Sequence, residues 1–207
     1  MKERPILFSA PMARAILAGT KTQTRRVITN HPGDQWTHDG FGRITSKHPK
    51  QGRFGLFVRR GLGTDFPECD IVPCPYGQPG DQLWVRETWG LHAYGDDTDW
   101  VKGSCTDLDL EDSEIAYRAD WGPMQESCHW RPSIHMPRAA SRISLEITSV
   151  RVERLGDVSE SDARAEGVVQ SVAEFKELWA SINGPSSWDA NPWVWVVEVK
   201  RVEGGAA

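Results

Sequence analysis

Two long segments without regular hydrophobic periodicity limit what this chain can fold into. Residues 28–79 are rich in Gly, Pro, Asp and His, and the segment of about 95–130 carries clustered acidic residues. Both compositions favour turns and loops over long helices or strands. One strand is expected in each, over residues 54–60 and 115–119. Elsewhere the short elements follow the order strand, helix, strands, helices, strand. This order predicts an α+β fold built on a small antiparallel barrel rather than a parallel sheet.

The N-terminal elements are short. A strand is expected over residues 6–9, followed by a helix with Pro11 in its first turn, where proline is well tolerated. Gly19 is a natural stop for this helix. A Pro-Gly-Asp turn then precedes a strand over residues 83–88. Successive side chains of a strand point to opposite faces. The residues expected to share one face are Leu83, Val85 and Glu87.

The C-terminal elements carry clearer signals. Residues 144–155 alternate like a strand, and their apolar register slips near Ser149, which predicts a bulge. Two helices follow, capped by Ser159 and Ser171, each with an acidic residue three positions later, as in a capping box. The run "PWVWVVEVKRV", residues 192–202, alternates like a final strand.

Length and composition exclude several classes of protein. The 207 residues suit a single domain over residues 1–207, and a net charge of -5 excludes binding to duplex nucleic acid through overall positive charge. No run approaches the ~20 apolar residues that span a bilayer, and the N-terminus lacks the apolar segment of a signal peptide. We therefore expect a cytoplasmic protein without a membrane partner. The four cysteines lack paired CxxC spacing, so neither a metal nor a cofactor is expected.

A polar cluster follows the predicted helix stop. The segment "AILAGTKTQTRRV", residues 15–27, places Lys21 and Thr24 three positions apart, a spacing that brings side chains together on a turn but not on a straight strand. Glu166 lies in the last turn of a predicted helix, where the helix dipole disfavours a carboxylate by ~0.3–1 kcal/mol. These residues are either a solvated surface, which is the commoner place for Lys and Glu, or one site. A site requires Lys21 and Thr24 to face the same cavity, with Glu166 within reach of Lys21.

Several segments together resemble the ASCH superfamily. The motif "AGTKTQTRR", then "PGD" before a strand, "DVSESDARAEG" on a helix and "WVWVVEV" at the end stand in the order of that family. The resemblance covers the elements before residue 28 and after residue 80, and it implies a PUA-like β-barrel with flanking helices. The segments "CPYGQPGDQLWVRETW" and "RPSIHMPRAASRI" are similar to longer members often carried by phages and prophages. Residues 28–79 and 95–130 would then be two loop-rich insertions.

The resemblance also implies an activity. Minimal members are amidohydrolases that convert N(4)-acetylcytidine to cytidine and acetate, and their catalytic residues fall on Lys21, Thr24 and Glu166 when the motifs are superposed. Lys21 would deprotonate Thr24 for attack on the acyl carbonyl, which requires a pKa below the usual ~10.4 of lysine. Glu166 would orient Lys21 and pass a proton to the departing amino group. Direct attack by a water that Thr24 holds is the alternative.

A wider set of residues would hold the substrate. Tryptophan faces stack on bases, although packing in a core is the alternative for any one indole. Arginines near the polar cluster would hold a ribose or phosphate, and the proline-framed tract 131–142 suits a pocket wall. The candidate substrate-binding residues are Arg25, Arg26, Trp84, Arg86, Ser133, His135 and Arg138.

Two other functions stay open. The first is a non-catalytic module that binds RNA or a modified base, a function for which a PUA-like barrel is suited. The second is a ribonuclease. Both predict salt-dependent affinity for a polynucleotide, whereas a hydrolase acting on free nucleosides does not. The acidic segment 95–114 favours a small-molecule nucleoside as the partner over RNA.

Overall fold

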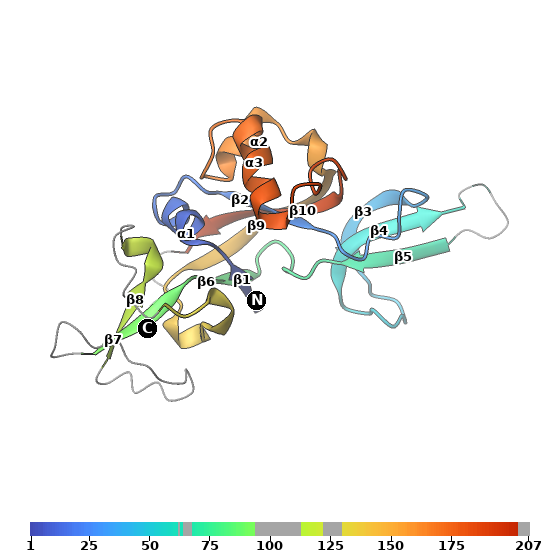
Figure 1. Cartoon of the computed structure of the whole chain (residues 1–207). Helices are drawn as coiled ribbons and strands as arrows, with labels where there is room; N and C mark the ends of the chain where they lie inside the picture. The colour runs from blue at the N-terminus through green and yellow to red at the C-terminus, as the bar shows by residue number, and fades with distance from the viewer. Residues whose placement is uncertain (62, 64–67, 94–112, 122–129, 203–207) are drawn as a thin grey trace.

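The computed structural model describes residues 1–61, 63, 68–93, 113–121 and 130–202. Its main element is a five-stranded sheet in the order β1-β6-β9-β10-β2 (Figure 1). β1 and β6 run parallel, and the other neighbours run antiparallel, so the expected antiparallel arrangement fails at this one pairing. The strands are β1 (Glu3–Leu7), β2 (Gln23–Val27), β6 (Gln82–Arg86), β9 (Ser144–Arg154) and β10 (Trp193–Arg201).

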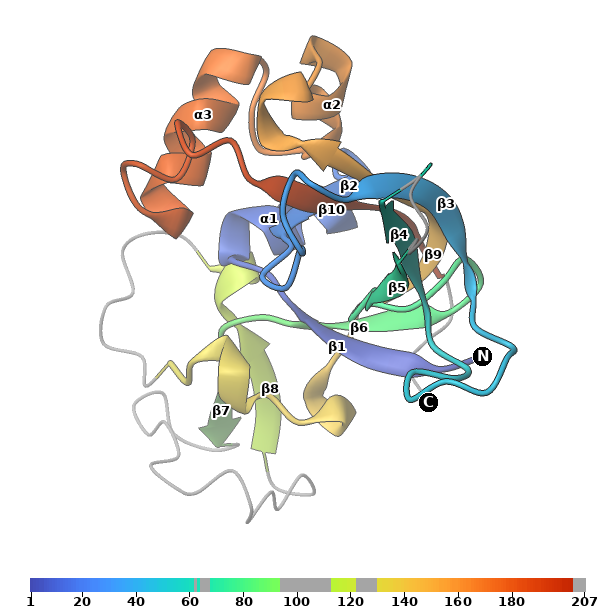
Figure 2. The same cartoon turned by 90° about the vertical axis from the view of Figure 1, so that its right-hand side faces the viewer.

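Strand β10 is covered on both faces. Val194 and Val196 pack into a cluster with Phe175 and Trp179, which we call the helix core. Side chains on the opposite face, such as Val197, join a larger cluster, which we call the sheet core. The helices over the helix core are α2 (Glu160–Ala165) and α3 (Val172–Asn183), and Figure 2 shows them on one side of β10 and β2.

The expected helix signals are confirmed. Ser159 caps α2 in a capping box with Asp162, and the Ser171 hydroxyl accepts a hydrogen bond from the Glu174 amide at the start of α3. The N-terminal helix α1 (Ala10–Leu17) has proline in its first turn. Gly19 follows it with a φ of 74°, in the left-handed region that ends helices. Local chemistry therefore fixes where these helices begin and end.

The expected bulge in β9 is also confirmed. Across β10, Glu198 pairs with Ser149 and Val199 pairs with Ile147, which leaves Thr148 as the extra residue. This insertion returns the apolar side chains of the strand to the sheet core, where Leu145, Ile147 and Val150 lie.

The segment 28–79 is more ordered than expected. It forms an antiparallel sheet of β3 (Thr37–Arg43), β4 (Phe54–Arg60) and β5 (Glu68–Pro73) that extends from one end of the main sheet (Figure 1). The expected strand at 54–60 is confirmed, and the two flanking strands are additional. β3 contains two glycines and is mostly exposed, so it lacks the alternation that marks a half-buried strand and depends on pairing with β4.

The second predicted insertion is described only in part. β7 (Trp89–Ala93) pairs with β8 (Ser113–Tyr117), and the predicted strand at 115–119 instead ends where the 3-10 helix η1 (Arg118–Asp120) begins. The acidic residues between 95 and 112 lie outside the described residues. Within the described residues the main sheet is open, with β1 and β2 at its edges, so the structure is an α+β fold.

Candidate functional site

Strand β2 divides its side chains between the two cores. Thr24 pairs with Val197 of β10, and Arg25 pairs with Val196. Because directly opposite residues of an antiparallel pair point to the same face, Thr24 points toward the sheet core and Arg25 toward the helix core. Lys21 lies just before the strand, and its Nζ is 5.4 Å from the centre of the Phe8 ring in the sheet core.

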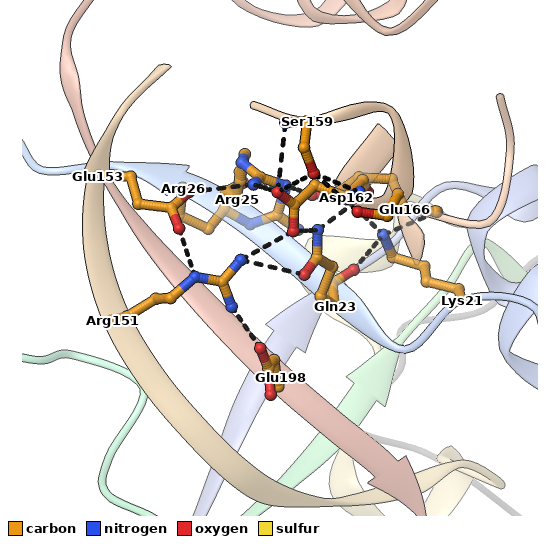
Figure 3. Close-up of polar contacts among 11 residues, drawn as sticks. Lys21, Gln23, Arg25, Arg26, Arg151, Glu153, Ser159, Asp162, Glu166 and Glu198 are labelled. Carbon is orange, nitrogen blue, oxygen red and sulfur yellow. Dashed lines mark hydrogen bonds and ion pairs between the residues drawn. The ribbon is translucent and has the colours of Figure 1, made fainter. Parts of the chain in front are cut away.

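Lys21 and Glu166 form a buried ion pair (Figure 3). The Lys21 Nζ lies 2.7 Å from Glu166 Oε2, and the side chains are 0% and 4% exposed. The same ammonium donates to the Gln23 carbonyl at 2.8 Å and to the Glu166 carbonyl at 3.1 Å. Its three protons therefore have three acceptors, which a buried charge requires. Lys21 is thus the basic residue that offsets the unfavourable position of the Glu166 carboxylate at the end of a helix.

A glycine makes this meeting possible. Gly167 has a φ of 79°, and a Cβ placed on it would lie 2.5 Å from the Lys21 Cβ and 2.6 Å from its Cα. The neighbouring backbone is tied as well, because the Thr22 amide donates to the Ala165 carbonyl at 2.9 Å. The end of α2 is thus docked directly on the segment before β2, which fixes the Glu166 carboxylate against Lys21.

Arg25 takes the second oxygen of Glu166. Its side chain is fully buried, with one terminal nitrogen 3.4 Å from Glu166 Oε1 and the other 3.1 Å from Glu153 and 3.4 Å from Asp162. Arg25 Nε has no hydrogen-bond partner among the described residues. Glu166 therefore stands between two cations, one on each carboxylate oxygen.

The network continues through Asp162 (Figure 3). Gln23 Nε2 donates to the Asp162 side chain at 3.1 Å, and Arg151 donates to the same carboxylate oxygen at 2.9 Å. Burial raises the pKa of Asp162, but hydrogen bonds from Ser159 and Gln23 outweigh it and lower that pKa to about 2. We call the whole set the Glu166 network: Lys21, Gln23, Arg25, Arg151, Glu153, Asp162, Glu166 and Glu198.

Burial lowers the pKa of Lys21 below 10.5, even though the charge of Glu166 opposes the shift. The neighbouring positive charges of Arg26 and Arg25 add to the lowering. An amine in such a place loses its proton more readily than a lysine in water. The direction of this shift is the one that a general base at this position would require.

A cavity of about 160 Å³, which we call the Glu166 cavity, opens beside this network. Glu166, Arg25 and Arg26 line it, together with Tyr76 and aromatic or apolar side chains of α3 such as Trp179. Lys21 and Thr24 are not among its lining residues. Of the predicted catalytic triad of Lys21, Thr24 and Glu166, Glu166 is therefore the residue that a molecule in this cavity would contact.

Thr24 is buried, at 1% exposure. The three hydrogen bonds of the Lys21 ammonium go to the Gln23 carbonyl and to two oxygens of Glu166, and none goes to the Thr24 hydroxyl. The geometry thus brings Lys21 and Glu166 together, but it does not bring the Thr24 hydroxyl to Lys21.

The other predicted site residues fall into two places. Arg26 lies over the Phe8 ring, donates to the Leu7 carbonyl at 2.8 Å and lines the Glu166 cavity. Arg86 and Arg138 lie over the ring of Trp84, which puts them on another part of the main sheet. The residues that do not line the Glu166 cavity are Trp84, Arg86, Arg138, and Ser133 and His135 of the 3-10 helix η2 (Ser133–His135).

Sequence reasoning missed most of the network around the triad. The sequence predicts a capping role for Asp162 and gives no sign of its contacts with Gln23 and Arg25. For Gln23, the alternation of side chains along β2 is the signal that could have placed it on the same face as Arg25. Glu153 and Arg151 come from β9, more than 120 positions later in the chain, and no local pattern links them to β2. Tyr76 and the α3 aromatics that line the cavity were likewise missed.

Comparison with protein-family models, with curated proteins and with solved structures gives no match. Within the described residues, no three His, Cys, Asp or Glu side chains are grouped so that they could hold a metal ion. No described helix has both the length and the apolar character needed to cross a membrane.

Proposed function

We propose that this protein is an amidohydrolase that removes the acyl group from N(4)-acylated cytosine nucleosides, as in the conversion of N(4)-acetylcytidine to cytidine and acetate. The observation that carries the proposal is the buried Lys21–Glu166 pair, 2.7 Å long, beside a cavity that Glu166 lines. A base of lowered pKa held against a carboxylate at a cavity is an arrangement typical of acid-base catalysis.

The proposal includes a PUA-like barrel of the ASCH type. Leu56 and Val58 of β4 and Val72 of β5 pack in the same sheet core as the strands of the main sheet. This shared core supports an arrangement in which the two sheets enclose one apolar interior. The motifs that carry the resemblance include Lys21 just before β2 and Glu166 at the C-terminal cap of α2.

Glu166 and Lys21 divide the proton transfers. In the reactive form Lys21 has lost one of its three protons, so its amine takes up the proton that the nucleophile releases, and Glu166 relays that proton because it lines the cavity and Lys21 does not. Glu166 then gives a proton to the cytosine amino group as the C–N bond breaks. Arg25 holds the second Glu166 oxygen and so fixes the direction of the carboxylate. The aromatic side chains of α3 provide an apolar wall for the pyrimidine ring.

Water is the nucleophile that fits the described geometry with least rearrangement. A water in the cavity would form the bond to the acyl carbon, and its proton would pass through the Glu166–Lys21 pair to the departing amine. The route through Thr24 needs its hydroxyl to leave the sheet-core side and reach Lys21, forming an acyl ester that a second water then hydrolyses. The two routes differ in whether Thr24 becomes acylated.

An absorbance assay with N(4)-acetylcytidine, with chromatography to identify cytidine, tests the proposal. Glu166→Gln and Lys21→Met should each lower kcat about 100-fold or more, the usual contribution of a general acid or base. Lys200→Met removes a lysine of an exposed pair with Glu146 and should leave turnover unchanged. The wild-type rate should rise with pH as Lys21 loses its proton, at a pH below 10.5.

Two results would overturn the proposal. One is the absence of turnover by the wild-type protein, and the other is undiminished turnover by folded Glu166→Gln. Circular dichroism on each variant separates loss of catalysis from loss of folding. Thr24→Val, matched in shape, distinguishes the routes: a loss as large as that of Glu166→Gln, with an acylated Thr24 in quenched wild-type samples, favours the covalent route.

A further inference from the structure

A second cavity, of about 430 Å³, lies between β1, the β3–β5 sheet and the turn that precedes β6. It shares no lining residue with the Glu166 cavity, so an inference about it does not depend on the hydrolase reaction. Its volume falls in the range of about 300–1,000 Å³ that is usual for small-molecule sites. The charged residues that line it are Lys2, Arg4, Arg43, Arg53 and Asp81.

Four of the lining side chains are cationic, and Asp81 is the one carboxylate among the described lining residues. The Asp81 carboxylate already accepts three hydrogen bonds. They come from the Arg4 side chain at 3.0 Å, from the backbone amide of Lys2 at 3.0 Å and from the backbone amide of Gln78 at 3.3 Å. These bonds outweigh the effect of burial and hold the pKa of Asp81 below its ordinary value. Asp81 therefore neutralises Arg4 and is part of the turn's structure.

Lys2, Arg43 and Arg53 remain without a carboxylate within ion-pair distance among the described residues. Arg43 donates to the amide oxygen of Gln78 at 2.7 Å, which leaves its positive charge in place. Three such cations around one cavity create a local positive potential on a chain whose net charge is -5. A concave surface lined by one sign of charge concentrates ions of the opposite sign.

The walls of the cavity suit more than a simple anion. Pro73 and Pro75 stiffen the segment after β5, and Gly77 has a φ of 120°, where a Cβ would lie 2.4 Å from an Arg4 nitrogen. Phe54 lines the cavity, and its ring is held by packing against the sheet core and by stacking with Phe41, so it adds rigid apolar surface to the wall beside the cations. The side-chain amides of Asn30 and Gln78 offer N–H donors, while their oxygens already accept from Thr29 and Arg43.

We propose that this cavity binds a nucleotide through its phosphate group, with Arg43, Arg53 and Lys2 donating to phosphate oxygens. Arginine is well suited to this task because its planar fork can donate two parallel hydrogen bonds to a phosphate. The phosphate belongs either to a free nucleotide or to a polynucleotide strand, and the two sources share this chemistry. The site is separate from the Glu166 cavity and binds without bond cleavage.

Isothermal titration calorimetry at low ionic strength tests the proposal with four probes: CMP, cytidine, inorganic phosphate and a short cytidine oligonucleotide without a terminal phosphate. CMP should bind, cytidine should bind at least 10-fold more weakly, and the Arg43→Gln/Arg53→Gln double variant should weaken CMP binding at least 10-fold. Lys47→Gln, an exposed lysine in the same segment that does not line the cavity, should leave the affinity for CMP unchanged.

The outcomes separate clearly because binding is measured without turnover. Tighter binding of the oligonucleotide than of CMP, lost in the double variant, supports the site and assigns the phosphate to a strand. Absence of binding by both CMP and the oligonucleotide at millimolar concentration overturns the proposal, as does an affinity for CMP that is the same in the double variant and in the wild type. Weaker residual binding of cytidine and CMP that the double variant retains belongs to the Glu166 cavity, which the two substitutions do not touch. Equal affinity for inorganic phosphate and CMP overturns the role of the base-binding wall. Circular dichroism confirms that the double variant is folded.

Discussion

The Glu166 network and the second cavity, which we call the cationic cavity after Lys2, Arg43 and Arg53 in its lining, are both rich in charged side chains. The charges are paired in the first region and unpaired in the second. In the first, Lys21 and Arg25 have fully buried side chains, and each lies within 3.4 Å of a carboxylate oxygen. In the second, Arg43 and Arg53 are exposed and have no carboxylate partner among the described residues. Burial forces charges to pair, because an unpaired ion in a protein interior is costly. Charges in contact with water can stay unpaired and remain available to a ligand.

The contrast predicts where a single substitution changes stability. Removing one partner of a buried pair leaves an uncompensated ion and costs about 3–5 kcal/mol. An exposed pair contributes about 0–1 kcal/mol because water screens it. The Glu166 network should therefore be sensitive to every loss of charge, and the cationic cavity should tolerate such losses.

The largest effect is expected for Glu166→Gln. It leaves the buried ammonium of Lys21 without its carboxylate, so the free energy of unfolding should fall by about 3–5 kcal/mol. Urea denaturation at neutral pH measures this. Glu146→Gln, which breaks the exposed pair with Lys200 at 3.2 Å, is the matched control and should cost about 1 kcal/mol or less.

A double variant tests whether the loss comes from the unpaired charge. Lys21→Met combined with Glu166→Gln removes both charges of the pair, so it should cost less than the sum of the two single variants. Equal effects of Glu166→Gln and Glu146→Gln would contradict the view that the network is held by buried charge pairing.

The elements that position Glu166 could be read from local signals. Ser159 caps α2 together with Asp162, only three positions away, and Gly19 ends α1 two positions after its last residue. Such short-range signals mark the ends of the helices in the sequence itself. The pairing of Lys21 with Glu166 was predictable because a carboxylate at a helix end is stabilised by a nearby cation. The ion pair is thus the part of the site that sequence could supply.

The rest depends on contacts between distant segments. Thr24 sits three positions after Lys21, but its direction is set by pairing with Val197 of β10, which no local pattern reveals. Arg25 meets Glu153 only because β9 and β2 flank the same strand. β3 lacks alternation and forms because β4 offers it a partner. The cationic cavity likewise joins Lys2 to Arg53 across the two sheets.

A second prediction sharpens the comparison through pH. The pKa of Asp162 is about 2 against an ordinary value of 3.8, so the folded state holds this carboxylate in its charged form. Its contribution to stability is complete above about pH 4 and is lost as the pH falls toward 2. Asp162→Asn should therefore be less stable than the wild type at pH 7, and the difference should shrink between pH 4 and pH 2.

Urea midpoints at pH 7, 4, 3 and 2 measure this difference. Asp157→Asn, an exposed carboxylate in the 3-10 helix η4 (Leu155–Asp157), is the control and should differ little from the wild type at any of these values. A gap between wild type and Asp162→Asn that stays constant down to pH 2 would show that the ionised form of Asp162 does not contribute.

The smallest effect is expected inside the cationic cavity. Arg53→Gln removes an exposed positive charge that has no carboxylate partner among the described residues, so the free energy of unfolding should change by no more than about 0.5 kcal/mol. Asp81→Asn in the same cavity should cost more, because Asp81 accepts hydrogen bonds from Arg4 and from two backbone amides. Thermal and urea unfolding of both variants provide the measurement. A loss from Arg53→Gln as large as that from Asp81→Asn would mean that Arg53 holds the fold together, in which case its charge is not free for a phosphate and the distinction between the two regions fails.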